Sequence, residues 1–243
     1  MKVLVAPNSF KEALDSIDVA KNIAIGLKRA ADEFLITELP LADGGAGTMQ
    51  IINRVLEGTI VKVKVSGPTD NKVEASYGLA KDFPSGDKIA IIELAQAAGL
   101  SLVPKRLRNP LKTTTNGVGQ LILDASRKDC KKVLLGIGDS ATIDCGVGAL
   151  SVLRFKFLAK NEREITPDGY GLLNVNKIDI SAVADELRRM KIIVLADVDN
   201  RLTGPDGALM FARQKGATDK MLSVIDDGLR RFRPVSYTHL RAH

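Results

Sequence analysis

Apolar and polar residues follow two simple rhythms at the start of the chain. Apolar runs at 2–6 and 34–42 have the length of buried strands. Between them, residues 16–30 place an apolar side chain every three to four positions, which is typical of an amphipathic helix. A second helix is expected over 48–56. This order of strand, helix, strand and helix predicts a parallel sheet with short connections.

The rhythm then changes. Three strand-like segments at 59–67, 72–80 and 88–95 follow one another with only turns between them. Strands without intervening helices indicate a mixed or antiparallel sheet, so we expect a second architectural unit that begins near Gly67. Further strands and helices are expected at 117–128 (helix), 132–137 (strand), 191–198 (strand) and 219–232 (helix). The whole pattern predicts an α/β protein.

Composition narrows the class of protein. The chain has no Trp and 4% aromatic residues, so its core must be mainly aliphatic. Cys130 and Cys145 show no CxxC spacing, and we expect reduced thiols in a cytoplasmic protein. The sequence contains no run of about 18 uncharged apolar residues, so no membrane span is predicted. The apolar run at the N-terminus is too short for a secretory signal and is interpreted as a strand.

The net charge of +6 comes from lysines and arginines that are spread along the chain. This charge suits an anionic small-molecule substrate, although an ordinary solvated surface explains it equally well. Basic residues are not interleaved with aromatic ones, so no nucleic-acid partner is predicted. The sequence carries no signal for an oligomeric state.

The segment "LPLADGGAGT" places one acid beside glycines at the end of a predicted strand. Gly44, Gly45 and Gly47 would let backbone amides approach a ligand, and Thr48 opens a helix whose N-terminus favours an anion. Asp43 beside such an anion requires a cation or a proton in transit between them. The segment therefore predicts a magnesium ion or a general base. A tight turn with a local Asp hydrogen bond is the alternative.

Two segments rich in hydroxyl groups also precede predicted helices. "GIGDSATIDCGVG" carries Ser140 and Thr142, and "NPLKTTTNGVG" carries Thr113 and Thr114. Both could bind phosphate, although neither matches a P-loop or a dinucleotide-binding fingerprint. A helix cap for the first segment and a solvated threonine cluster for the second are the alternatives.

A third strand end is acidic. Asp197, Asp199 and Asn200 follow the strand predicted at 191–198 and could hold a hydrated magnesium ion. Lys215, in "RQKGA", could meet the charge of a phosphate or a carboxylate. Because open α/β sheets bind ligands at the carboxyl ends of their strands, each of these strand ends is a candidate ligand site.

Taken together, these segments resemble the bacterial glycerate kinase family, of the glycerate 2-kinase type. The resemblance runs from Met1 to about Phe232. Six motifs carry it in the order and spacing of the family: "APNSFKEAL", "LADGGAGT", "NPLKTTTNGVG", "GIGDSATIDCGVG", "DVDN" and "QKGA".

The resemblance implies a fold of two α/β domains with the active site between them. Residues 1–66 would be the N-terminal part of a Rossmann-like domain with a parallel sheet, which is incomplete here. Residues 67–232 would form an inserted second domain with a mixed sheet. The change of rhythm near Gly67 agrees with this division.

The resemblance also implies an activity. ATP and Mg²⁺ would serve the phosphorylation of a hydroxyl group of D-glycerate, giving 2-phosphoglycerate, so the partners would be small molecules. Asp43 would handle the cation or the hydroxyl proton, and Ser9 would contact substrate or phosphate. Lys11 and Lys215 would neutralise charge on the phosphoryl group or the glycerate carboxylate. A plain surface position is the alternative for each lysine.

This chain departs from the family pattern at several positions. Asn8 and Ala46 replace carboxylates, and Asp139 and Cys145 stand where glycines are usual. The remaining departures are Ile143, Arg201 and Arg213. Asn8, Ala46 and Asp139 favour an alternative, a catalytically silent protein that binds nucleotides or sugar acids. A Rossmann dehydrogenase is disfavoured, because no strand leads into GxGxxG.

The last residues look unlike the rest. The last predicted helix should end at Phe232, because Pro234 breaks it, and residues 233–243 are interpreted as a foreign tail on a truncated gene. Both histidines, His239 and His243, lie in this tail. A missing C-terminal segment would leave the first unit with an uncovered apolar face, so we expect a poorly soluble or inactive chain.

Overall fold

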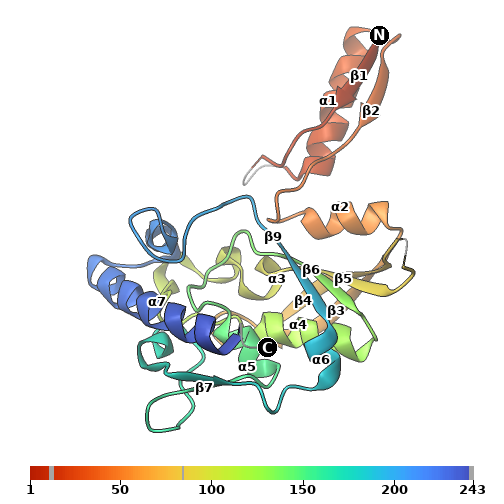
Figure 1. Ribbon diagram of the computed structural model, residues 1–243. Helices are drawn as coiled ribbons and strands as arrows, with labels where there is room; N and C mark the ends of the chain where they lie inside the picture. The colour runs from red at the N-terminus through yellow and green to blue at the C-terminus, as the bar shows by residue number, and fades with distance from the viewer. Residues whose placement is uncertain (11–13, 84, 241–243) are drawn as a thin grey trace.

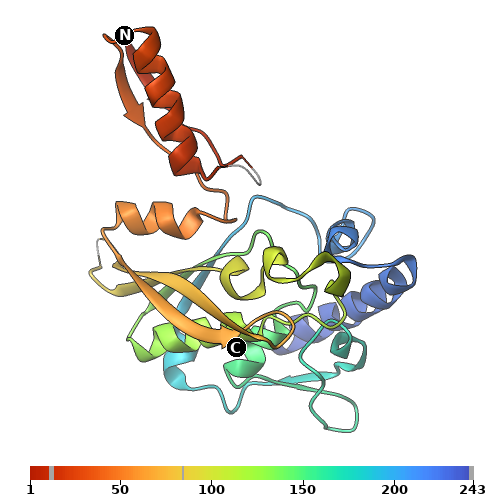
Figure 2. The ribbon, with the colours of Figure 1, turned by 180° about the vertical axis from the view of Figure 1, so that it is seen from behind.

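The computed structural model describes residues 1–10, 14–83 and 85–240, and a slender N-terminal arm projects from a larger body (Figures 1 and 2). The strands are β1 (Lys2–Val5), β2 (Leu35–Glu38), β3 (Thr59–Ser66), β4 (Lys72–Lys81), β5 (Lys88–Glu93), β6 (Lys132–Gly136), β7 (Lys156–Leu158), β8 (Lys177–Asp179) and β9 (Lys191–Leu195). The α-helices are α1 (Ser16–Ala30), α2 (Thr48–Val55), α3 (Ala95–Ala98), α4 (Asn116–Arg127), α5 (Val147–Val152), α6 (Asp185–Arg189) and α7 (Asp219–Leu240). Among the described residues, no helix is both long and apolar enough to cross a bilayer.

The arm consists of β1, α1 and β2. The two strands pair in parallel, as predicted, with Lys2 opposite Leu35. Helix α1 starts after Asp15, whose side chain accepts a hydrogen bond of 2.8 Å from the amide of Asp18 and so satisfies a free N–H of the first turn. The helix turns its buried residues toward the strands; these include Val19, Ala20 and Ala24.

The body is built on a five-stranded sheet of order β3-β4-β5-β6-β9. Strands β3, β4 and β5 are antiparallel neighbours, whereas β5, β6 and β9 run parallel, so the predicted mixed sheet is confirmed. Strand β3 pairs with β4 over its whole length, so residues 59–66 belong to the same sheet as the strands that follow Gly67. The division of the chain into two domains stays a prediction.

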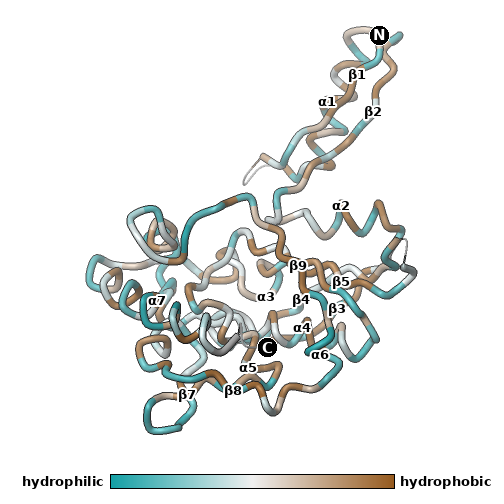
Figure 3. The backbone as a smooth tube through the Cα atoms, in the orientation of Figure 1, coloured by the Kyte–Doolittle hydropathy of each residue, from teal (hydrophilic) through white to brown (hydrophobic). Residues whose placement is uncertain are grey.

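Helices cover the sheet on both sides. Residues of α3 and α4 pack with Val65, Tyr77 and Ile92 in the main core. On the opposite face, Met49 of α2 packs against Ile89 and Ile91. Apolar colour runs through the central strands (Figure 3). Because these strands are buried from two sides, their sequence is continuously apolar instead of alternating.

A second core forms under α7. Ile225, Leu229 and Phe232 are buried there together with residues of β7, β8 and the turn between them. The prediction that this helix ends at Phe232 is wrong, since α7 continues through Pro234 to Leu240. Proline removes one backbone donor, but Val235 still packs against the second core and stabilises the next turn. The foreign origin of residues 233–243 stays a prediction.

Candidate active site

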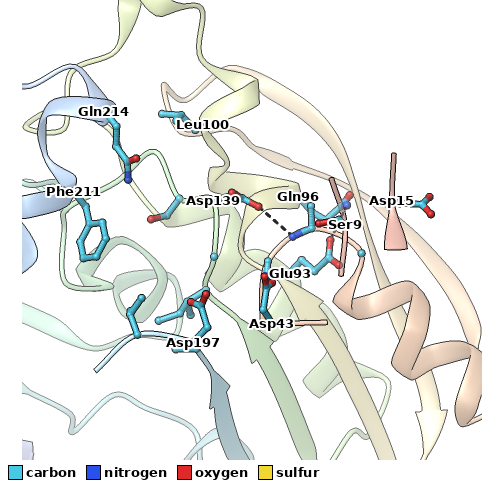
Figure 4. A pocket seen from close by; sticks show the side chains of 18 of the residues that line it. Ser9, Asp15, Asp43, Glu93, Gln96, Leu100, Asp139, Asp197, Phe211 and Gln214 are labelled. Carbon is cyan, nitrogen blue, oxygen red and sulfur yellow. Dashed lines mark hydrogen bonds between the residues drawn. The ribbon is translucent and has the colours of Figure 1, made fainter. Parts of the chain in front are cut away.

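A cavity of about 900 Å³ opens between the arm and the carboxyl ends of β5, β6 and β9 (Figure 4). This is the edge at which open α/β sheets bind ligands. Seven of the predicted site residues line it: Ser9, Asp43, Gly45, Gly47, Ser140, Asp197 and Lys215. Lys11 lies outside the described residues. The structure therefore brings seven of the fifteen predicted site residues together in one cavity.

Backbone hydrogen bonds tie the strand ends together beneath the cavity. The amide of Gly138 donates to the carbonyl of Gly44 at 3.1 Å, and the amide of Ile137 donates to that of Leu195 at 3.2 Å. Gly44 has φ +91°, and a Cβ there would lie 2.5 Å from the Leu195 carbonyl oxygen. A larger residue would separate the segments, so this glycine serves close packing of the backbone.

Asp43 stands at the mouth of the first glycine-rich turn. Its carboxylate accepts hydrogen bonds from the Asn8 amide group at 2.8 Å and from the Gly45 backbone amide at 3.0 Å. Asp139, in the left-handed region at φ +56°, accepts from the Ala46 amide at 3.2 Å. A Cβ on Gly45 would lie 3.1 Å from an oxygen of each carboxylate, so both acids flank this glycine.

A third carboxylate, Glu93, was not among the predicted residues. It ends β5, is 3% exposed and lines the cavity. It accepts the Met49 amide at 2.8 Å, in the first turn of α2, and the Gln96 side chain at 3.3 Å. The Glu93 carboxylate thus lies at the N-terminus of α2, where the helix dipole favours a negative charge. A lone acid at the end of the apolar run "KIAIIE" was the signal for it.

Lys215 is buried at the far wall of the cavity. Its ammonium group donates to the Ser140 hydroxyl at 2.6 Å and to the Thr142 carbonyl at 2.9 Å. Burial lowers the pKa of Lys215 to about 8, while the charge of Asp144 opposes the shift. The amine therefore changes charge close to neutral pH.

Asp144 is a second acid that the spacing did not suggest. It is buried and accepts four hydrogen bonds: from the amide and hydroxyl of Thr115 at 2.9 and 2.7 Å, and from the amides of Gly146 and Gly148 at 3.1 and 3.3 Å. Burial raises the pKa of Asp144, and these hydrogen bonds oppose the rise. It does not line the cavity but acts on Lys215 through its charge.

Other predicted residues lie outside the cavity lining. Thr113 and Thr114 are buried and donate to the carbonyls of Ala141 and Pro167 at 2.9 and 2.7 Å. The side chain of Asn200 donates to the Asp206 carbonyl at 2.8 Å. The rest of this group, Gly44, Thr48, Thr142 and Asp199, is likewise absent from the lining. Among them, Thr48 accepts the Gly44 amide at 3.1 Å. Direct roles for these residues in binding stay predictions.

Comparison with known proteins identifies the family. Residues 3–243 match the family model described as "Glycerate kinase family". The chain belongs to the glycerate kinase family. The resemblance drawn from six short motifs is therefore confirmed.

Individual members of the glycerate kinase family agree. A glycerate kinase from Halalkalibacterium halodurans is 42% identical over 231 residues, which cover 95% of this chain and 60% of the relative. A glycerate 2-kinase from Escherichia coli K12 is 39% identical over 236 residues, 97% of this chain and 61% of the relative. The crystal structure of a putative glycerate kinase 2 from Salmonella typhimurium LT2 superposes with a TM-score of 0.84 at 38% identity, covering 99% of this chain and 64% of that one. The chain thus spans about 60% of the length of these curated relatives.

The residues present fit a magnesium ion that arrives with a nucleotide. Among the residues that the structure describes, no three metal-binding side chains are grouped as a ready cage. Mg²⁺ keeps several waters and is bound through one or two carboxylates together with substrate phosphates. Of the two predicted metal ligands, Asp197 lines the cavity and fits that mode, whereas Asp199 does not line it.

Proposed function

We propose that the complete protein transfers the γ-phosphoryl group of ATP to a hydroxyl group of D-glycerate, giving 2-phosphoglycerate and ADP. The observation that carries this proposal is the convergence of the arm, the first glycine-rich turn and Lys215 on one cavity in a member of the glycerate kinase family. The names of the relatives from Halalkalibacterium halodurans and Escherichia coli K12 specify glycerate and support the choice of substrate.

The charges of the lining support a need for cations. Among its described residues, Asp15, Asp43, Glu93, Asp139 and Asp197 are acidic, and Lys215 is basic. ATP and glycerate are both anions, so this wall would repel them without positive charge between. Mg²⁺ supplies that charge on the phosphates when bound.

Each residue has a separate part in the proposed step. As the glycerate oxygen forms its bond to the γ-phosphorus and the bond to ADP breaks, Asp43 accepts the proton of the attacking hydroxyl. Hydrogen bonds from Asn8 and Gly45 orient this carboxylate. Lys215, held by Ser140, stabilises negative charge on the transferring group. Ser9, at the arm side of the cavity, contacts the substrate.

One observation favours a silent binding protein as a second candidate. The amides of Gly44, Gly45 and Ala46 donate to Thr48, Asp43 and Asp139 instead of facing the cavity without a partner. A phosphate would have to compete with these acceptors. Such a protein would bind ATP or glycerate without consuming ATP.

The test is a coupled assay of ADP release by the complete gene product with D-glycerate and Mg²⁺, run beside calorimetric titration with ATP. Steady ADP release that requires glycerate supports the kinase. If ATP binds but no ADP is released, either with D-glycerate or with related hydroxy acids, the result supports the silent binding protein. A cytoplasmic location is proposed as well, because both cysteines are free thiols in the structure.

A further inference from the structure

The place of Lys215 depends on a short turn of 3₁₀ helix, Arg213–Lys215. The side chain reaches from this turn across to Ser140 and Thr142, and the residue is only 8% exposed. A small shift of the turn would move the ammonium group or admit water to it. The residue that holds this turn in place therefore controls both the position of the ammonium group and its exclusion from water.

Arg108 joins this turn to the neighbouring segment 100–103. Its guanidinium group donates to the carbonyls of Val103 at 3.3 Å, Gln214 at 3.3 Å and Leu100 at 3.4 Å. Leu100 and Gln214 both line the cavity, where they lie at the same rim (Figure 4). One half-buried side chain thus binds Gln214, the residue next to Lys215, and the segment 100–103 beside it.

Residue Arg108 also packs directly against Gly216, which follows the turn. Gly216 follows Lys215 with φ +94°, and a Cβ there would lie 2.5 Å from the Arg108 carbonyl oxygen and 2.6 Å from the Arg108 Cβ. The turn can rest on Arg108 this closely only because residue 216 is glycine. The side chain and the main chain of Arg108 therefore both contact the turn that carries Lys215.

The chemistry of arginine explains why this residue type stands here. A guanidinium group carries five N–H donors in a fixed plane and can bond three carbonyls, here two from the segment 100–103 and one from Gln214. The ammonium group of lysine is a compact point charge and cannot span the same three oxygens.

We propose that Arg108 is a positioning residue of this site, which fixes the location and solvent exclusion of the Lys215 ammonium group without touching substrate. Its effect on turnover rests on the kinase activity proposed above. Its effect on Lys215 itself does not.

The charged groups around Lys215 give the proposal a measurable sign. Burial lowers the pKa of Lys215 to about 8, and Asp144 acts in the opposite direction. Two further charged groups lie near the amine. Arg108 donates to the Gln214 carbonyl, and Asp139, the residue before Ser140 in the chain, lines the cavity. If Arg108 no longer holds the turn, water reaches the amine, and its pKa should rise toward the ordinary lysine value of about 10.4.

The first experiment measures the Lys215 amine directly in the complete gene product. Acetic anhydride acylates neutral amines, so the pH dependence of Lys215 acetylation, followed by peptide mass spectrometry, reports its pKa. We expect a midpoint near 8 in the unsubstituted protein and in Arg106→Ala, an exposed arginine of the same segment. Arg108→Ala and Arg108→Lys should raise the midpoint by roughly one pH unit or more. An unchanged midpoint in folded Arg108→Lys overturns the proposal, and this variant decides if Arg108→Ala does not fold.

The second experiment separates positioning from mere stability. A displaced Lys215 should lower kcat by about 10- to 100-fold with little change in KM, and activity should persist to higher pH because the amine stays protonated longer. Loss of activity in proportion to unfolded protein, with an unshifted pH profile, overturns the proposal. A shifted acetylation midpoint in a protein that never releases ADP supports the role of Arg108 and contradicts the kinase function alone.

Discussion

The arm and the body both contain parallel strands joined through a helix, yet they bury those strands very differently. In the body, Ile91 and Ile92 of β5 are 1% and 0% exposed, because helices cover both faces of the sheet. In the arm, Leu4 of β1 and Leu35 of β2 are 62% and 64% exposed, since α1 covers one face of a two-stranded sheet. The cavity therefore has one wall from a well-packed core and another from a thinly packed arm.

This difference shows what local pattern does and does not determine. The same apolar run produces a strand in either place, but the free energy it contributes depends on how many layers cover it. Leucines offer a direct comparison, since the chain has them in both regions.

The largest expected contrast is between Leu121→Ala in the body and Leu4→Ala in the arm. Leu121 is fully buried, so its truncation should lower the free energy of unfolding by about 2–5 kcal/mol. Leu4 is mostly exposed, and its truncation should cost less than about 1 kcal/mol. Urea unfolding of the complete gene product measures both. Equal losses would break the comparison.

The next effect concerns the acid at the junction of the two regions. Asp43→Asn should lower kcat on the order of 100-fold or more and leave nucleotide binding almost unchanged, because its proposed interaction strengthens in the transition state. Asp227→Asn, an exposed acid on α7, is the matched control. Steady-state kinetics and calorimetry provide the two numbers. Near-normal turnover would make Asp43 a turn residue.

A smaller effect tests the wall formed by the body. Lys215 has a folded pKa near 8, below its unfolded value, so between these values the unfolded chain binds more protons and stability rises with pH. Lys215→Met has no titrating amine at this position, so its stability lacks this pH dependence. Between pH 8 and pH 10, the free energy of unfolding of the unsubstituted protein should therefore rise by roughly 1 to 3 kcal/mol more than that of Lys215→Met. Parallel urea titrations at these two pH values measure it, and a constant difference would mean that Lys215 is solvated.

The smallest effect tests the wall formed by the arm. Asn8→Ala removes one exposed hydrogen bond to Asp43, of 2.8 Å, and should lower kcat/KM by about fivefold or less. Asn22→Ala, on the exposed side of α1, should change nothing measurable. If Asn8→Ala proves as damaging as Asp43→Asn, the arm orients the acid far more strongly than its packing suggests.

Particular residues show how far the sequence could lead. The strands of the five-stranded sheet were predictable because buried sheets need apolar runs, whereas the three-residue strands β7 and β8 were not predicted. The site was predictable in part because parallel strands end at one edge. The continuation of α7 past Pro234 was not, since it depends on contacts of Val235 with a distant core. Glu93 and Asp144 were missed because their partners, Met49 and Thr115, are brought to them only by the fold.

Asp144 has a further consequence, for the order of folding. Its carboxylate bonds Thr115, just before α4, and Gly146 and Gly148 at the start of α5, which has only six residues. A helix that short is not stable alone, so α5 should form only when the acid already contacts α4. The two helices should then dock in one kinetic step. In that case, Asp144→Ala slows refolding as much as it destabilises the native state, because the contact exists at the barrier.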